Sequence, residues 1–165
     1  MTRRKPIILI PLTRGKFAEI DAADASLVTD TLWSATHVGR RWYAIGRING
    51  EQVLMHRLIT NAAIGMDVDH IDGDGLNNKR DNLRIATRSQ NMANVSIGPR
   101  SKSGFKGVSW HAGAGRWRAT TISNGRQVHL GYFDNVEDAA RAYDAKAREI
   151  FGEFARLNFP DESAA

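Results

Sequence analysis

Hydrophobic residues alternate with polar ones in the first third of the chain, the period expected of half-buried strands. The segments KFAEI, WYAIGRI and QVLMHRL, residues 16–20, 42–48 and 52–58, are the clearest examples. The pair Asn49-Gly50 stands between the last two of them, and this pair between two apolar runs is typical of a β-hairpin turn. The pattern predicts a region of β-hairpins at the start of the chain.

The opening residues MTRRKPIILIPL place basic residues before an apolar run, as a secretory signal does. The run ends at Pro11 without a small-residue cleavage pattern, and no later apolar stretch is long enough to span a bilayer. We therefore expect this run to form the first strand of a cytoplasmic protein that does not associate with a membrane.

The next part of the chain predicts a strand, a loop, a second strand and a short helix. The β-prone segment MDVDHI covers residues 66–71, the polar loop DGDGLNNKRD covers 72–81, and the second strand NLRIA covers 82–86. A threonine and a glutamine with the spacing of a capping box then predict a helix over residues 88–94. This order brings several Asp, His and Asn side chains within reach of one point.

A linker and three further strands follow. The linker SIGPRSKSG, residues 96–104, is rich in Ser, Gly and basic residues, and such a segment is extended and mobile. Beyond it, GVSWH, RWRATTI and QVHLGYF predict strands over residues 107–111, 116–122 and 127–133.

The last predicted element is a helix between Asn135 and Gly152. Asn135 suits the N-cap position, Asp138 lies in the first turn, and apolar residues recur at helical spacing from Val136 onward. Gly152 is suited to end the helix. The apolar face is rich in alanine, so we expect this helix to pack closely against the three-stranded sheet as scaffold.

Composition and charge narrow the class of protein. The chain has 165 residues, 42% of them hydrophobic, and no cysteine, which excludes a disulfide framework and a thiolate zinc site. The net charge is +5, and residues 82–133 contain many Lys and Arg but no Asp or Glu. A basic stretch of this length, with aromatic residues interleaved, favours binding to DNA or RNA over a merely solvated surface.

Several kinds of site compete for the Asp, His and Asn residues of the middle segment. An EF-hand calcium loop starting at Asp72 would need glycine and glutamate where the chain has Asn77 and Leu83. A zinc site would need more histidines or thiolates. Turn chemistry accounts for a set of loop residues, Asp72, Gly73, Asp74, Gly75 and Asn77. For the others, a carboxylate and an amide oxygen would leave open positions on an octahedral Mg²⁺ for water and phosphate.

The segment VDHIDGDGLNNKRDNLRIATRSQNMAN closely resembles the HNH endonuclease motif of the phage and homing type. His70, Asn82 and Asn91 match its three motif positions, and Asp69 is the acid before the motif histidine. The resemblance implies that His70 is the general base and that Asn82 fixes the loop and orients His70. It also implies that Asp69 and Asn91 hold one Mg²⁺ or Mn²⁺ ion.

The motif differs from HNH forms that end in histidine or carry cysteine pairs, which favours a weakly held hard ion over zinc. The upstream segment MHRLI, residues 55–59, also resembles the segment that precedes the motif in phage-type proteins. We interpret His56, at the end of a predicted strand, as structural and leave it out of the site.

The third segment, from GFKGVSW to the closing LNFP, resembles the apetala/ethylene-response-factor DNA-binding domain of plant transcription factors. That family lays a three-stranded sheet in the DNA major groove. Its DNA-facing positions fall on Lys106, Ser109, His111, Thr120, Gln127 and His129. Arg118 shares a strand face with Thr120 by the two-residue period, and Arg116 and Arg126 flank the same sheet.

This chain departs from the plant members of that family, which have arginines at the positions of Ser109, His111 and Gln127 and tryptophan at that of His129. Arginine reads guanine with two hydrogen bonds, which serine, glutamine and neutral histidine do not reproduce. The target sequence of the plant proteins therefore does not transfer. We expect Trp117 to lie in the core of the sheet.

Together these features predict an α+β protein in which β-hairpins precede a small ββα-metal HNH nuclease module, and a three-stranded antiparallel sheet packs on one helix. The expected divisions are 1–95 for the nuclease part, 96–104 for the linker, 105–160 for the DNA-binding domain and 161–165 for a tail.

The expected function is site-directed, metal-dependent cleavage of double-stranded DNA by a protein of a phage or mobile element. We expect no small-molecule substrate and a monomer, with a dimer left open. A DNA-binding transcriptional regulator with an inactive HNH segment is the alternative, and RNA binding or cleavage is a third possibility.

Overall fold

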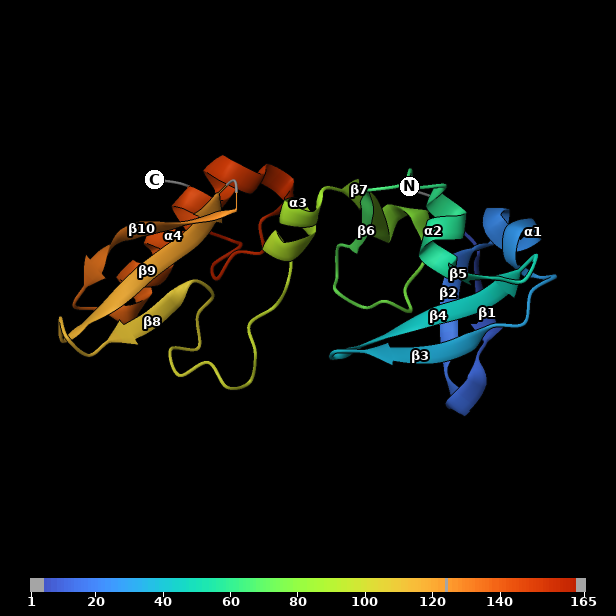
Figure 1. Ribbon diagram of the computed structural model, residues 1–165, viewed down its shortest axis with the longest axis horizontal. Coiled ribbons are helices and arrows are strands. Elements are labelled where there is room, and N and C mark those ends of the chain that lie inside the picture. Colours follow the sequence, from blue (N-terminus) through green and yellow to red (C-terminus); the bar gives the residue numbers. More distant parts are fainter. Residues whose placement is uncertain (1–4, 124, 163–165) are drawn as a thin grey trace. The chain divides into compact units, whose positions relative to one another are not determined.

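The computed structural model describes residues 5–123 and 125–162, which fall into two compact units, Met1–Thr87 and Arg88–Ala165. Several small sheets and few helices make up the chain, so the expected α+β class is confirmed (Figure 1). The division between the units lies inside residues 1–95, which we expected to form one module. The module boundaries and the ββα-metal arrangement stay predictions.

The first unit begins with two small antiparallel sheets. β1 (Ile7–Pro11) pairs with β2 (Phe17–Asp21), and β3 (Ser34–Val38), β4 (Arg41–Ile48) and β5 (Glu51–Leu54) form a sheet in the order β3-β4-β5. The strands expected at the opening run and around KFAEI and WYAIGRI are confirmed. The short helix α1 (Ala25–Val28) and the strand β3 had no clear sequence signal.

The expected Asn-Gly hairpin is confirmed between β4 and β5. Asn49 and Gly50 have φ values of 53° and 83°, which is the left-handed conformation that a tight hairpin turn requires at its two central residues. The hairpin matters for the site, because β5 leads directly into helix α2 (Met55–Thr60).

The prediction of one strand over residues 52–58 is wrong. The strand ends at Leu54, and α2 takes up the remainder until Asn61 ends it in a left-handed conformation with φ 49°. Met55 and Ile59, four residues apart, are buried on the same side of this helix together with His56. The short apolar run suggested a strand, but burial of residues at helical spacing makes this segment a helix.

The HNH-like segment forms a two-stranded antiparallel sheet, β6 (Asp67–His70) and β7 (Leu83–Ala86), as the sequence predicted. Val68 and Leu83 of this pair belong to the same buried core as Ile20 of β2 and Met55 of α2. Helix α1 (Ala25–Val28) adds a buried valine to that core. The β6–β7 pair is thereby anchored to the rest of the unit.

The second unit starts with the short helix α3 (Arg88–Ala93), as expected. Strands β8 (Val108–His111), β9 (Arg116–Ser123) and β10 (Arg126–Phe133) then form an antiparallel sheet in the order β10-β9-β8. Helix α4 (Val136–Phe151) follows and lies along one face of this sheet (Figure 1).

Helix α4 has the ends that the sequence predicted. The Asn135 side chain accepts a hydrogen bond from the Glu137 backbone N–H at 2.7 Å, and Gly152 follows with φ 53°. Fully buried Ala139 and Ala140 pack with Ala119 of β9, so small side chains allow close contact between helix and sheet.

The closing LNFP segment is held by a buried carboxylate of α4. Asp144 is only 2% exposed and accepts hydrogen bonds from the backbone N–H groups of Asn158 and Phe159 at 2.8–2.9 Å. The Asn158 side chain also bonds both backbone groups of Lys106. This network joins the end of the domain to its beginning.

Short 3₁₀ turns complete the secondary structure at Thr13–Gly15, Ala22–Asp24, Arg80–Asn82 and Gly152–Phe154. Among the helices in the part of the chain that the structure describes, none is long and apolar enough to cross a bilayer.

Candidate functional site

Asp69 and Arg84 are direct partners in the β6–β7 ladder. The Arg84 guanidinium donates to one oxygen of Asp69, with distances of 2.8 Å from Nε and 2.7 Å from Nη2. The carboxylate side chain is fully buried and the guanidinium is 13% exposed. Arg84 is a site residue that the sequence analysis missed, because it was counted only as part of the basic stretch.

His70 ends β6 and is buried, with 3% of its surface exposed. Its Nε2 lies 3.4 Å from Oδ1 of Asn78, a fully buried residue of the following loop. Burial lowers the pKa of His70, and the hydrogen bond with Asn78 acts in the opposite direction without reversing the shift. The imidazole is therefore neutral at neutral pH, the state in which it can accept a proton.

Asn82 braces the loop between β6 and β7. Its side-chain oxygen accepts from the Asp72 backbone N–H at 3.0 Å, and its side-chain nitrogen donates to the Asp72 carboxylate and to the Asn77 carbonyl at 3.0 and 2.8 Å. These bonds agree with the expected role of Asn82 in fixing the loop. Its link to His70 runs through the loop backbone.

The turn interpretation of the loop residues is confirmed. Asp72 accepts from the Asp74 backbone N–H at 2.8 Å, and Asp74 accepts from that of Leu76 at 3.0 Å. Burial acts to raise the pKa of Asp72, but hydrogen bonds from Asp74, Asn77 and Asn82 outweigh it, so the pKa is lowered. The carboxylate stays ionised and holds the loop closed.

Three aromatic rings from separate segments meet beside the site. The ring centroids of His56 and His70 are 4.9 Å apart with planes at 89°, and Tyr43 of β4 lies 5.7 Å from His56 and 5.9 Å from His70. Burial lowers the pKa of His56 to about 3, with smaller contributions from His70 and Arg57. His56 is thus a buried, neutral neighbour of the candidate base.

The two expected metal ligands both offer side-chain oxygen: Asp69 a carboxylate at the end of β6, and Asn91 an amide on α3. Within the described ranges 5–123 and 125–162, no three His, Cys, Asp or Glu side chains cluster as metal ligands. The donor chemistry fits a hard ion that keeps several waters. Asn91 belongs to the second unit, and its pairing with Asp69 stays a prediction.

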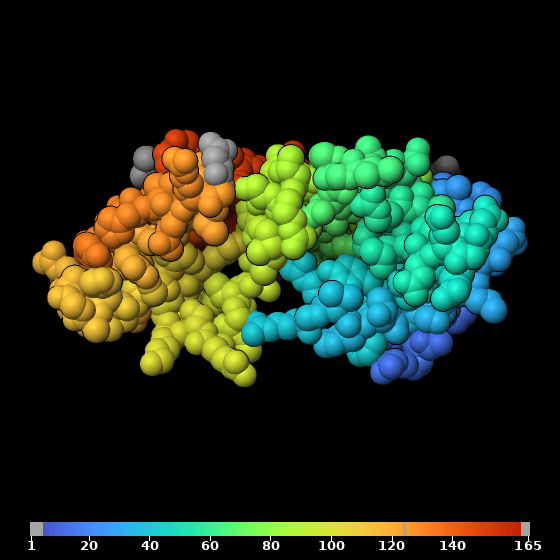
Figure 2. Space-filling view, in the orientation of Figure 1, coloured from blue at the N-terminus to red at the C-terminus, as the bar shows by residue number. Residues whose placement is uncertain are grey.

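In the second unit, the strand register gathers most of the expected DNA-facing residues on one face of the sheet. The cross-strand pairs are Ser109–Arg118, His111–Arg116 and His129–Thr120, with Gln127 opposite Ile122. By alternation these residues lie on the face opposite the buried Ala119 and Thr121, which point toward α4. Figure 2 shows β9 and β10, gold to orange, at the surface of this unit.

Two expected DNA-facing residues have other surroundings. Lys106 precedes β8, and its ammonium donates to the Ala93 carbonyl at the end of α3. Arg126 pairs with Ser123, so alternation turns it away from the face that carries Gln127 and His129. The surroundings of Lys106 depend on a segment far away in the sequence, which carried no signal for this contact. For Arg126 the signal was the strand period, which places it and Gln127 on opposite faces.

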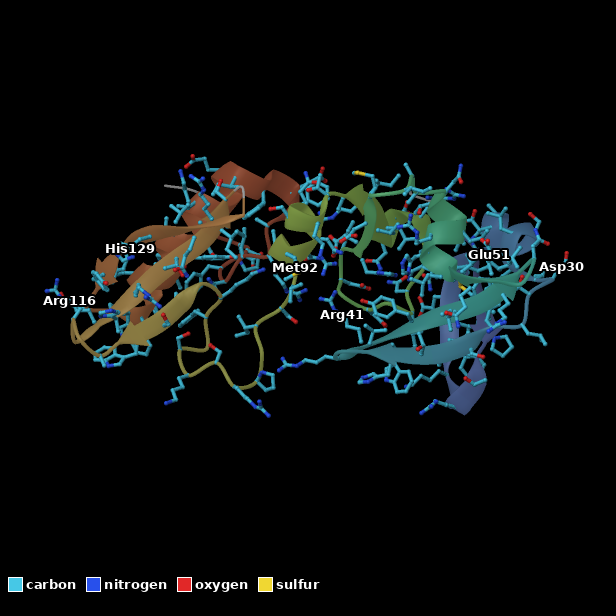
Figure 3. The ribbon with its side chains drawn as sticks, viewed as in Figure 1. Asp30, Arg41, Glu51, Met92, Arg116 and His129 are labelled. Carbon is cyan, nitrogen blue, oxygen red and sulfur yellow. The ribbon has the colours of Figure 1, made fainter. Side chains whose placement is uncertain are left out.

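The face itself combines basic and aromatic side chains. Arg116 lies near the tip of the β8–β9 hairpin, with Asp134 2.9 Å from its Nε, and His129 lies further along on β10 (Figure 3). Tyr132 is in ring contact with His111 at 5.1 Å and with His129 at 4.7 Å. Such a face can contact phosphates and base edges together.

Arg118 and the two tryptophans complete the description of the sheet. Arg118 Nη2 lies 3.4 Å from the Ser109 hydroxyl, and its Nε is buried without a hydrogen-bond partner in the described residues. Trp117 packs against the core, as expected, while Trp110 is 52% exposed and meets it edge-on at 5.2 Å.

Two parts of the chain each match the model of a known protein family. Residues 53–93 match the model of the HNH endonuclease family, and residues 103–153 match the AP2 domain, the domain type of apetala and ethylene-response factors. No solved structure is significantly similar to the chain.

This chain aligns with about three quarters of the length of each of two viral relatives. Protein 3.8 of Escherichia phage T7 is 39% identical over 93 residues, which are 56% of this chain and 76% of that protein. The uncharacterized HNH endonuclease L560 of Acanthamoeba polyphaga mimivirus is 32% identical over 150 residues, or 88% of this chain and 76% of the relative.

The plant relatives match a smaller share of the chain. The AP2-like ethylene-responsive transcription factor TOE2 of Arabidopsis thaliana is 43% identical over 72 residues, which are 43% of this chain but 15% of that protein. With the viral relatives and both family models in agreement, the chain belongs to the HNH endonuclease family and carries an AP2-type DNA-binding domain in addition.

Proposed function

We propose that the protein is a metal-dependent DNA endonuclease in which His70 is the general base. The observation that carries the proposal is the buried, neutral His70 directly after the buried carboxylate of Asp69, within the segment that matches the HNH family. A neutral imidazole beside a carboxylate supplies the two chemical functions that hydrolysis of a phosphodiester needs at neutral pH.

In the proposed reaction, the imidazole of His70 takes a proton from a water molecule as that water attacks the phosphorus. The bond from phosphorus to the 3′ oxygen breaks, and the leaving oxygen takes up a proton from solvent. Asn82 would keep the loop closed through Asp72 and Asn77, and Asn78 would hold the base in place at Nε2. These contacts support a pre-positioned base.

Asp69 and Asn91 would bind one Mg²⁺ or Mn²⁺. When bound, such an ion neutralises charge at the scissile phosphate and stabilises the leaving oxygen. Because Arg84 already donates to one oxygen of Asp69, the carboxylate would be shared between the guanidinium and the ion. Sharing of the ligand suits weak, exchangeable binding.

The sheet face of the AP2 domain would bind the major groove of duplex DNA and direct cleavage to a site. The expected contacts are Ser109, His111, Arg116, Arg118, Thr120, Gln127 and His129, with Lys106 and Arg126 contributing charge. Tethering to this domain makes the nuclease contact effectively intramolecular. We expect a monomer, and the viral relatives support a role in a phage or mobile element.

The test is cleavage of plasmid and phage DNA by the purified full-length protein. We expect cleavage with Mg²⁺, its loss with a chelator, and a fall of about 10²–10⁴-fold in rate for His70→Ala with little change in DNA binding. His37→Ala is the matched control, because His37 is an exposed residue of β3. A protein that binds DNA without cutting it would instead be the regulator with an inactive HNH segment.

A further inference from the structure

His56 is a buried polar residue that turn or helix chemistry does not explain. It is the second residue of α2 and is 6% exposed, between the fully buried Met55 and the core around Ile59. Its ring atom Nδ1 is buried and has no hydrogen-bond partner among the residues that the structure describes. A partnerless buried nitrogen costs stability, which an apolar side chain at this position would avoid.

The position of the ring gives a reason for its presence. The ring planes of His56 and His70 are perpendicular, and the 4.9 Å between their centroids is close contact. Tyr43 closes the third side, since its ring meets both histidines in an edge-on arrangement at 5.7 and 5.9 Å. A flat ring against another at a right angle restricts rotation of both.

The loop that carries the Asp and Gly residues in turn holds Tyr43. A Cβ atom at Gly75 would lie 2.3 Å from the Trp42 carbonyl oxygen and 2.6 Å from the Tyr43 ring. The loop backbone therefore comes as close to β4 as only glycine allows. This contact limits the space in which Tyr43, and through it His56 and His70, can move.

The charge state of His56 agrees with a packing role toward His70. Burial keeps its pKa low, at about 3, so the ring is uncharged at neutral pH and does not repel a protonated His70. The Asn78 contact to His70 is long, at 3.4 Å, and the perpendicular ring of His56 adds a packing constraint on the same imidazole.

We propose that His56 is a positioning residue of the nuclease: together with Tyr43, its flat ring fixes the plane of the His70 imidazole. This inference rests on the proposed role of His70 as base, and extends the site to helix α2 and strand β4. The feature required at residue 56 is a planar ring of this size.

The test compares His56→Ala, His56→Leu and His56→Phe in the full-length protein. We expect Ala and Leu to lower kcat by about 10- to 100-fold, because a misplaced catalytic group costs this much, with KM for duplex DNA nearly unchanged. His56→Phe keeps a flat ring and should retain most of kcat. If His56→Ala does not fold, the comparison is made between His56→Leu and His56→Phe, because both side chains fill the space of the imidazole.

The ring signals of His70 in ¹H–¹⁵N NMR spectra give a readout independent of cleavage. They should match wild type in His56→Phe and shift in His56→Leu. Equal kcat for Leu, Phe and wild type would overturn the proposal, and so would a Phe variant as slow as Leu, which would assign the effect to the nitrogens. Failure of the base assignment is seen separately, as full activity in His70→Ala.

Discussion

Arg84 and Asp69 form a buried ion pair across the β6–β7 ladder, with Nε and Nη2 of Arg84 within 2.8 Å of the same carboxylate oxygen. Pairs of this kind are costly to break from one side, because the charge that remains is poorly solvated. This relationship ties the stability of the β6–β7 sheet to the candidate metal ligand.

Replacing Arg84 with methionine should lower the free energy of unfolding by about 3 kcal/mol, because it leaves the Asp69 carboxylate buried without its guanidinium. Added Mg²⁺ should stabilise this variant more than wild type, since the ion would take over the vacated oxygen. Chemical denaturation with and without Mg²⁺ measures both effects. Lys5→Met is the control, because Lys5 and Asp81 form an exposed pair that should contribute little to stability. A variant as stable as Lys5→Met would contradict the prediction.

Asn91→Ala should raise the Mg²⁺ concentration needed for half-maximal cleavage, with partial recovery at higher Mg²⁺ or with Mn²⁺. Asp69→Asn should act in the same direction, because each change removes or weakens one oxygen ligand of a hard ion. Ser89→Ala, an exposed position on the same helix α3, serves as control. Cleavage that is indifferent to chelator in any of these proteins would refute the hard-ion site.

Acid should destabilise the protein partly through His56. Its folded pKa of about 3 lies below the ordinary 6.5, so between these values the unfolded chain binds a proton that the native chain does not. Stability should therefore fall as pH drops below about 6.5. Between pH 7 and pH 5, His56 should account for a loss of about 2 kcal/mol in the free energy of unfolding.

The measurement is urea denaturation of wild type and His56→Phe at pH 7 and at pH 5. The variant should lose less stability than wild type over this interval, while His70 and the other groups contribute equally to both. Parallel losses in the two proteins would mean that His56 is not buried in its neutral form.

Arg118→Ala should weaken binding to duplex DNA and lower the steepness of its salt dependence. Arg118 lies on the sheet face with Ser109 and Thr120, and one lost phosphate contact reduces the slope of log K against log salt by about 0.9. Lys146→Ala on α4 removes the same charge from the helix that covers the other face. Fluorescence anisotropy at several salt concentrations measures the affinity of both variants for DNA. Equal slopes of log K against log salt for Arg118→Ala and Lys146→Ala would argue against binding through this face.

Lys106→Met should loosen helix α3, because the Lys106 ammonium and the Arg156 backbone N–H both donate to the Ala93 carbonyl at its end. Hydrogen exchange of the α3 amides should become faster than in Lys102→Met, a control of equal charge in the exposed preceding segment. Unchanged exchange in Lys106→Met would show that the bond is dispensable.

Much of the local structure followed from the sequence because it depends on neighbouring residues. The opening apolar run placed β1, and alternation placed β2 and β4. The Asn49-Gly50 pair placed the turn between β4 and β5, and the capping Asn135 and terminal Gly152 bounded α4. The order of the segments likewise placed His70 at the end of one strand and Asn82 at the start of the next, and the structure differs only in that β7 begins one residue later, at Leu83. Turn conformations, caps and side-chain period are short-range properties that a single sequence carries.

The tertiary structure decided which of these residues meet. A short apolar run at residues 52–58 suits a strand or a helix, and burial of Met55 and Ile59 in the common core selected the helix from Met55 onward. That choice placed His56 against His70. Arg84 became the partner of Asp69 by the register of two strands, although its sequence context marked it as surface charge.

The physical reason is that these contacts join segments far apart in the chain and depend on how the segments share one core. Residue spacing on β6 determines that Asp69 and His70 are adjacent, whereas the ring of Tyr43, the helix start at Met55 and the loop at Gly75 meet them only after β4, α2 and β6 have packed together. The sequence by itself therefore determined the chemistry of the site, and the packing of its surroundings determined the environment in which that chemistry operates.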